Sequence, residues 1–230
     1  SVDGAQDHDI ILRAVDRMMG EDRHASRKAE LPVAHIPKVL YHWRCYEGST
    51  SENPESKRYA YEAGKRAVED FLKSREYRAD VVHTCHLGFF RVNYQPDLLS
   101  NRPDAAVVGG KLIDRHNRVV GGIYDESKEP LYLGLHKEYS GYMHRASCQQ
   151  EAYAVDIRCM VCSEEAQKVL TELTGLPYVR HPHTGYFLYQ DLLKTDADYR
   201  ELSLRFCEEL RRRGKRIVWD PEMVQRIEQR

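Results

Sequence analysis

Two acidic residues near the N-terminus, Asp7 and Asp9, are the side chains that best suggest chemistry, and Arg13 stands four places after Asp9. A carboxylate can act as a general base that accepts a proton in catalysis. Acidic residues in a first helical turn are also favoured by the helix dipole alone. The pair therefore indicates either a catalytic group or the capped start of an amphipathic helix.

Other groups of potential ligands are more simply explained as structural. Cys159 and Cys162 have the spacing of a zinc or redox pair, but no second pair accompanies them. The His and Cys residues within 83–86 and the two histidines within 181–183 have no clear partners either. The Asp-Ala-Asp sequence at 196–198 has the spacing of a metal motif, but it stands where a helix begins and predicts helix capping.

Alternating helices and strands must position these residues, which places the chain in the α/β class. Apolar spacing predicts a helix over 7–19 that ends at Gly20. Ser163 and Gly175 are expected to cap the two ends of a later helix. The remaining expected elements are helices over 54–73 and 198–213 and strands over 39–43, 81–83, 89–94, 105–108, 118–123, 130–135, 152–161 and 216–219. The sequence pattern changes near Tyr94, where a second set of expected elements begins, so we expect two domains, 1–95 and 96–230.

Composition narrows the class of protein. The 230 residues are 41% hydrophobic, so the chain can bury a core. The 35 basic and 36 acidic side chains give a net charge of −1, which predicts no nucleic-acid partner. No apolar run approaches the roughly 18 residues of a transmembrane helix, and the first residues do not resemble a signal peptide. A cytoplasmic protein with reduced cysteines is the expectation.

Several segments resemble glycosyltransferases of family 2. Residues 6–13 (Gln-Asp-His-Asp-Ile-Ile-Leu-Arg) are similar to the acidic motif at the acceptor end of that family, and the resemblance continues through 35–44 and 48–50. A looser resemblance covers 107–112, 121–122 and 141–145. These segments imply pieces of two GT-A units, a Rossmann-like fold in which a parallel sheet with flanking helices holds a nucleotide-sugar. The first piece resembles the acceptor side of one copy, and the second a truncated copy.

The resemblance implies roles for individual residues. Asp7 would be the catalytic base, and Asp9 and Arg13 would brace the loop and helix start that position it. Arg44 would bind the donor diphosphate, because a guanidinium group pairs with phosphate oxygens. His42 matches a position that approaches the metal in some relatives, although a histidine with one structural hydrogen bond is at least as good an explanation. A divalent cation, Mn²⁺ or Mg²⁺, would neutralise the departing diphosphate.

Departures from the family pattern limit what we expect of this chain. Its first copy lacks the upstream donor-binding half, and in the second copy Tyr199 stands where a base would be, although a phenol is a poor base near neutral pH. The second copy is therefore expected to be catalytically degenerate.

The parent function implied is transfer of a sugar from a nucleotide-sugar donor to a glycan acceptor, as in cell-surface polysaccharide synthesis, and this chain alone is expected to be inactive. The alternative is a non-catalytic module that binds glycan or docks on a partner or a second copy. The resemblance also allows a peripheral position at the inner face of the membrane.

Overall fold

The computed structural model describes residues 3–19, 33–34, 36–42, 58–178, 193 and 195–227. The chain divides into two compact units, Ser1–Asp97 and Leu98–Arg230. The sequence led us to expect a division after residue 95. Each unit has its own helices and strands.

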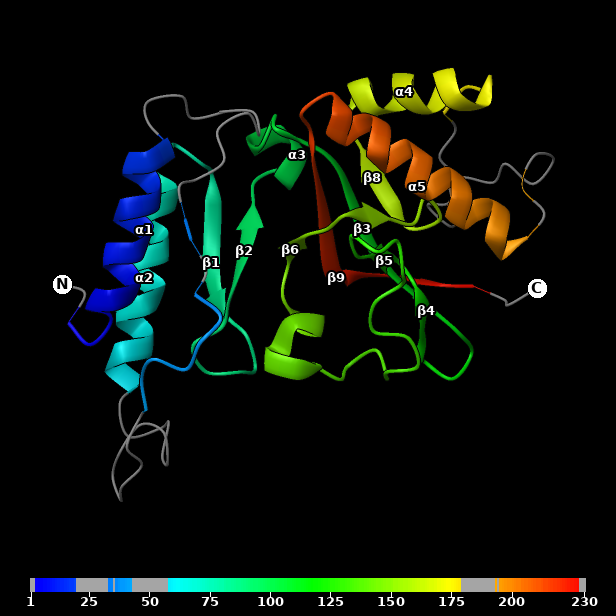
Figure 1. The fold of residues 1–230 in the computed structure, drawn as a ribbon. Helices are drawn as coiled ribbons and strands as arrows, with labels where there is room; N and C mark the ends of the chain where they lie inside the picture. Colours follow the sequence, from blue (N-terminus) through cyan, green and yellow to red (C-terminus); the bar gives the residue numbers. More distant parts are fainter. Residues whose placement is uncertain are drawn as a thin grey trace. The chain divides into compact units, whose positions relative to one another are not determined.

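Unit 1 contains two helices and an antiparallel strand pair: α1 (Gln6–Met19), α2 (Arg58–Ser74), β1 (Ala79–His83) and β2 (Phe90–Tyr94). Helix α1 packs along α2, and β1 pairs with β2 so that Val81 lies opposite Val92 (Figure 1). The helix predicted over 7–19 is confirmed. The helix predicted over 54–73 is confirmed from Arg58 onward, and its expected start lies outside the described residues.

The core of unit 1 is formed mainly by α2, because one face of this helix carries small and apolar residues. Ala63, Ala67 and Leu72 are at most 5% exposed, and Val81 of β1 is 3% exposed. Helix α1 buries none of its residues to that degree, and Ile10 and Ile11 are 67% and 59% exposed. Unit 1 therefore carries an apolar helix face that its described residues leave open to solvent.

Unit 2 is built on a mixed sheet whose central strand is β3 (Ala105–Ile113). Every residue of β3 is buried, as expected for a strand covered on both faces. Strand β9 (Arg216–Arg226) pairs with β3 in parallel, and β4 (Val119–Gly121) and β8 (Met160–Cys162) pair with β3 antiparallel. Strand β6 (Gln150–Glu151) extends the sheet beyond β9. A separate short pair joins β5 (Ile123–Tyr124) to β7 (Ala154–Val155).

The helices of unit 2 are α3 (Leu98–Asn101), α4 (Glu164–Thr174) and α5 (Asp196–Arg212), with a 3-10 segment η2 (Tyr142–Ser147). Helix α4 packs against α5, and α5 lies on β7 and β9 (Figure 1). Phe206 and Leu210 of α5 and Trp219 of β9 are fully buried in the shared core. Burial of such side chains is the main term that holds these layers together.

Both predicted caps of α4 are confirmed. The Ser163 hydroxyl accepts the backbone N–H of Ala166 at 3.3 Å. Gly175 closes the helix in the left-handed region at φ 70°, where a residue without a Cβ avoids strain.

Four expected strands are wrong in whole or in part. The strand expected over 118–123 is interrupted at Gly122, between β4 and β5. Val39–His42, the described part of the strand expected over 39–43, forms no strand and is exposed. The strand expected over 130–135 is absent because Tyr132 and Gly134 have positive φ angles of 63° and 77°. The strand expected over 152–161 is interrupted between β7 and β8 by a turn, in which the Cys159 N–H donates to the Asp156 carbonyl.

Gly109 allows β7 to pack directly on the backbone of β3. A Cβ at Gly109 would lie 2.3 Å from the Val155 Cβ, closer than real contacts allow. This close approach fixes β7, and with it the turn that begins at Asp156.

The two units together show an α/β protein with helices and mixed sheets. In the part of the chain that the structure describes, no helix combines the length and apolarity that crossing a bilayer requires.

Candidate functional site

The acidic residues singled out in the sequence lie in the first turn of α1. Asp9 is paired with Arg13, with 2.7 Å between the carboxylate Oδ2 and the guanidinium Nε. This hydrogen bond and the charge of Asp9 raise the pKa of Arg13. Asp7 is exposed, and its described hydrogen bond comes from the neighbouring backbone N–H of His8 at 2.9 Å. One carboxylate is therefore held by an arginine, and the other faces solvent.

Two contacts hold α1 on the rest of unit 1. Arg75, which follows α2 and is 3% exposed, lies 2.5 Å from the Asp16 carboxylate and donates to the Asp16 carbonyl at 2.8 Å. Near the other end of α1, the His8 ring stacks on Phe90 of β2, with centroids 6.3 Å apart. The N-terminal turn is thereby positioned by both its helix neighbour and the β1–β2 pair.

A cavity of about 260 Å³ lies between α1 and α2. Three of its lining residues are acidic, Asp9, Asp16 and Asp70, and Arg13 also lines it. Asp7 is not among the lining residues. The structure therefore brings Asp9 and Arg13 together at this cavity and leaves Asp7 on a separate, open surface of α1.

The other predicted site residues stand apart from α1's first turn in the sequence. His42 is exposed, in a segment without helix or strand. Arg44 lies outside the described residues. Within the described ranges, no three His, Cys, Asp or Glu side chains gather in a way that could hold a metal ion. His42 as a metal ligand and Arg44 as a phosphate ligand stay predictions.

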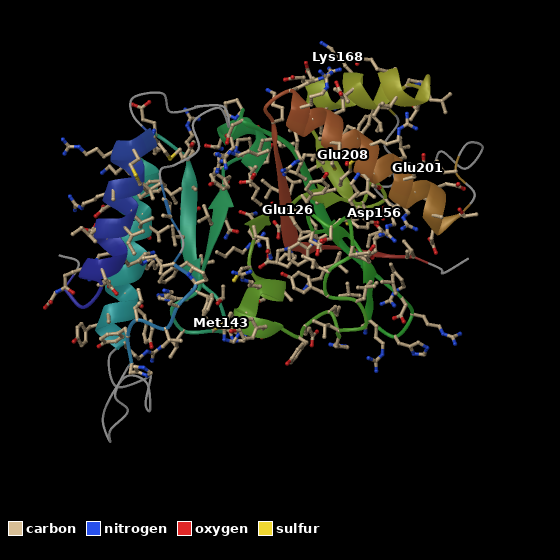
Figure 2. The ribbon with its side chains drawn as sticks, viewed as in Figure 1. Glu126, Met143, Asp156, Lys168, Glu201 and Glu208 are labelled. Atoms are coloured by element: carbon tan, nitrogen blue, oxygen red, sulfur yellow. The ribbon has the colours of Figure 1, made fainter. Side chains whose placement is uncertain are left out.

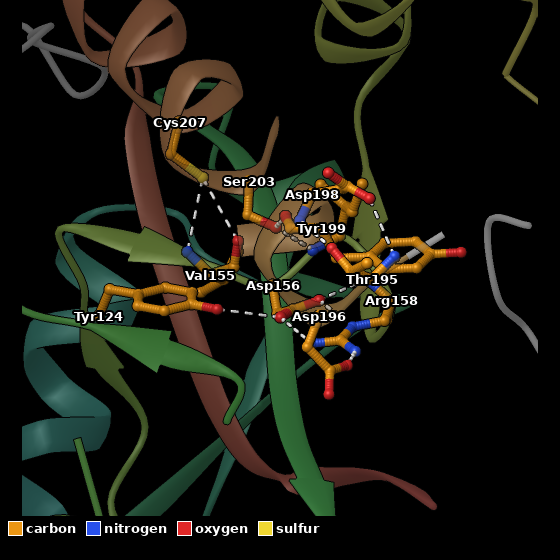
Figure 3. A network of polar contacts seen from close by, with 11 residues as sticks. Tyr124, Val155, Asp156, Arg158, Thr195, Asp196, Asp198, Tyr199, Ser203 and Cys207 are labelled. Atoms are coloured by element: carbon orange, nitrogen blue, oxygen red, sulfur yellow. Dashed lines mark hydrogen bonds and ion pairs between the residues drawn. The ribbon is translucent and has the colours of Figure 1, made fainter. Parts of the chain in front are cut away.

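A buried polar network occupies unit 2, at the turn between β7 and β8 (Figure 3). Asp156, with no exposed surface, accepts hydrogen bonds from Arg158 Nε at 2.9 Å and Nη2 at 2.8 Å. The Tyr124 hydroxyl donates to the same carboxylate at 3.0 Å. Arg158 Nη1 reaches Asp196 of α5 at 2.5 Å. One guanidinium group thus joins two carboxylates that stand 40 residues apart in the sequence.

Burial and the neighbouring charges shift the pKa values of two members of this network. Burial raises the pKa of the Tyr124 hydroxyl, and the adjacent Asp156 charge raises it further. Burial alone would lower the pKa of Arg158, but its hydrogen bonds to Asp156 and Asp196 reverse the direction and raise it. The Tyr124 phenol therefore stays neutral and the Arg158 guanidinium stays charged at neutral pH. Buried ion pairs of this kind are costly to disturb.

Helix α5 supplies the other groups at this place. Thr195 and Asp198 form a reciprocal capping box: the Thr195 hydroxyl accepts from the Asp198 N–H, and the Asp198 carboxylate accepts from the Thr195 N–H. The capping role predicted for this Asp-Ala-Asp segment is confirmed for Asp198, and Asp196 binds Arg158 instead. Tyr199 stacks under Arg158, 4.8 Å from ring centroid to Cζ.

A second cavity, of about 310 Å³, lies against the network. Arg158, Asp196 and Arg200 line it, together with Tyr124 and apolar side chains. The volume falls at the lower end of the roughly 300–1,000 Å³ usual for small-molecule sites.

The three buried cysteines of unit 2, Cys159, Cys162 and Cys207, do not form a reactive site. Burial raises the pKa of Cys159 and Cys207 to about 12 and that of Cys162 to about 11. These thiols are protonated at neutral pH, whereas the thiolate is the nucleophile and the metal ligand.

Sequence reasoning missed the Asp156–Arg158 network. The available signal was the pair of opposite charges, Asp156 and Arg158, inside an otherwise apolar stretch. Charged residues are rarely buried unless they are paired, so this pair could have been identified as a buried ion pair. The partner Asp196 could not, because nothing local links it to Arg158.

Comparisons with known proteins do not assign this chain to a family. No family model matches the chain. No solved structure matches it significantly. Over 70 residues, 30% of this chain, the sequence is 41% identical to "Uncharacterized protein y4gI" of Sinorhizobium fredii (strain NBRC 101917 / NGR234). The chain spans only 7% of that protein's length.

Proposed function

We propose that this chain belongs to a glycosyltransferase resembling family 2, in which Asp7 takes the proton from the hydroxyl group of a glycan acceptor. The observation that carries the proposal is the arrangement at the start of α1. There Asp9 is held by Arg13 at 2.7 Å, and the Asp7 carboxylate is exposed. A GT-A fold, a nucleotide-sugar donor and a glycan acceptor are parts of the same proposal.

The physical argument is a division of roles between two carboxylates. A general base needs free lone pairs within reach of the proton it removes. Asp9 Oδ2 accepts a hydrogen bond from Arg13, and the Asp9 side chain is only 13% exposed. Asp7 faces solvent, and its described hydrogen bond, from the His8 N–H, uses Oδ1 and leaves Oδ2 open. The Asp9–Arg13 pair braces the turn from which Asp7 projects.

The described residues do not provide a set of ligands for the divalent cation that the resemblance to family 2 implies. Among these residues no three His, Cys, Asp or Glu side chains are arranged so that they could hold a metal ion, and His42 would supply a single ligand. The proposed chemistry therefore involves the Asp7 carboxylate and the acceptor hydroxyl. Mn²⁺ or Mg²⁺, with Arg44 on the donor diphosphate, remains the family-based expectation.

The test is a transfer assay on the longest natural chain that carries this sequence, with UDP-, dTDP- and GDP-sugars and Mn²⁺. Asp7→Asn should lower kcat by about 10²–10⁴-fold, the usual contribution of a general base. Asp80→Asn, a carboxylate-to-amide change on β1 of the same unit, is the matched control and should leave kcat unchanged. Transfer that survives Asp7→Asn at the control rate would refute the base assignment. The 230-residue chain alone should show no transfer.

One observation favours the alternative of a module that docks on a partner. Ile10 and Ile11 on α1, and Val39 and Leu40 in the segment without helix or strand, are each at least 59% exposed. Apolar surface of this kind is typical of interaction sites. If the longest natural chain binds glycans but transfers no sugar from any donor, the docking or glycan-binding function replaces the enzymatic one.

A further inference from the structure

The cavity beside α5 in unit 2 has no role in the function proposed above. Its charged groups come from α5 and from the turn after β7. The ion pair with buried Asp156 holds Arg158, Arg158 in turn binds Asp196, and Arg200 is bound to the Lys128 carbonyl and Glu129. Figure 3 shows Arg158 reaching from Asp156 to Asp196 at this place. A rigid set of polar groups around a cavity is the general form of a small-molecule site.

Open hydrogen-bonding positions remain on two lining residues. Arg158 occupies Oδ1 of Asp196, and Oδ2 has no hydrogen-bond partner among the described residues. Arg200 uses Nη2 for the Lys128 carbonyl at 2.7 Å and the Glu129 carboxylate at 3.0 Å. Its Nε and Nη1 are without partners within the same described part of the chain. An acceptor and a donor therefore stand one helical turn apart on α5.

The ion pairs already formed at the cavity decide whether an anionic, a cationic or a neutral ligand would fit it. Each guanidinium group is already ion-paired here, Arg158 with Asp156 and Asp196, and Arg200 with Glu129. An anion would have to displace Asp196 or Glu129 from its arginine, and a cation would face both guanidinium groups. A neutral ligand avoids both costs.

The remaining wall is apolar or aromatic. Val120, Pro130 and Ile227 line it, and the Tyr124 ring lies beneath the Arg200 guanidinium, 6.0 Å from centroid to Cζ. A ligand that matches has neighbouring hydroxyl groups on one edge, each both donor and acceptor, and C–H groups on its face. A sugar ring has this distribution.

We propose that this cavity binds one ring of a neutral saccharide, with Asp196 and Arg200 hydrogen-bonded to neighbouring hydroxyl groups. The choice of a saccharide rests in part on the proposed function, but the binding does not involve Asp7. Unit 2 then serves to hold a glycan although it carries Tyr199 in place of a base.

The test is titration of the ¹⁵N-labelled 230-residue chain with neutral methyl glycosides of hexoses, deoxyhexoses, pentoses and N-acetylhexosamines. At least one should shift the amide signals of Ala197 and Arg200 in a saturable way. Asp196→Ala and Arg200→Ala should each raise Kd at least tenfold. Glu201→Gln is the control on the same helix, at an exposed position that does not line the cavity (Figure 2), and should leave Kd unchanged.

Three results would overturn the proposal: no glycoside shifts these amides, the two alanine variants bind as the wild type does, or inorganic phosphate saturates the same signals instead. Asp196 and Arg200 are 48% and 40% exposed, so both variants are expected to fold, which their spectra will check. Asp7→Asn should not change glycoside binding here. Transfer that does not depend on Asp7, together with retained glycoside binding, would refute the proposed function alone. Transfer that depends on Asp7, together with absent glycoside binding, would refute the cavity proposal alone.

Discussion

Removal of Arg158 should destabilise unit 2 more than any surface substitution. Arg158 is 12% exposed, and its partner Asp156 is fully buried. In Arg158→Met the carboxylate loses both guanidinium hydrogen bonds, at 2.9 and 2.8 Å, and keeps the Tyr124 hydroxyl at 3.0 Å and a backbone N–H. Breaking a buried pair by removing one partner costs about 3–5 kcal/mol, because a charge is left buried without its counterion.

The assay is urea unfolding followed by the fluorescence of Trp219, which is fully buried in unit 2. A Trp43→Phe background removes the other tryptophan, so that the signal reports on unit 2 alone. The matched control is Arg205→Met, an exposed arginine of α5, for which the change should stay within about 0.5 kcal/mol.

The double variant Asp156→Asn/Arg158→Met separates the buried charge from simple loss of packing. Removing both charges should cost less than Arg158→Met alone, since no unpaired carboxylate remains. The reasoning would be refuted if Arg158→Met cost less than about 1 kcal/mol, or if the double variant were at least as unstable as Arg158→Met.

Three further predictions concern unit 2. Ser163→Ala should lower the free energy of unfolding by about 1 kcal/mol, measured by urea unfolding, because the Ala166 N–H loses its cap; a neutral result would contradict the capping assignment. Ellman's reagent at pH 8 should leave Cys159, Cys162 and Cys207 unmodified until the protein unfolds, because burial raises their pKa values, whereas the exposed Cys85 should react at once. Above pH 10 stability should fall, because the raised pKa of Tyr124 keeps it protonated when folded while the unfolded phenol ionises; Tyr124→Phe should flatten that slope, and an unchanged slope would contradict the assignment.

Local patterns predicted the elements that local interactions decide. Helix α1 follows from apolar spacing, and α4 follows from Ser163 and Gly175, whose capping interactions lie within a few residues. Strand β3 was expected to be short, and the structure extends it to Ile113 because β9 pairs along its whole length. That pairing is a long-range property, which no window of sequence contains.

The errors have the same origin. Val39–His42 is apolar enough for a strand, but a strand needs a partner, and these residues pair with none in the described part of the chain. Strand β9 was expected to end at Trp219, before Pro221, yet it continues to Arg226. The pairing with β3 is irregular between Gly109 and Lys111, and such an irregularity tolerates a proline without a ladder hydrogen bond.

The two candidate sites differ in what their carboxylates can do. Asp156 is fully buried and commits both oxygens to Arg158 and Tyr124, so it can fix a shape but has no lone pair to offer a substrate. Asp7 is exposed and takes one backbone N–H, so it can accept a proton but adds little to the fold. The same carboxylate-to-amide change should therefore affect different properties at the two sites. Asp156→Asn should lower the free energy of unfolding, whereas Asp7→Asn should lower turnover and leave stability unchanged. If Asp7→Asn instead destabilised α1, the acidic pair would be a helix cap, and its resemblance to a catalytic motif would carry no chemistry.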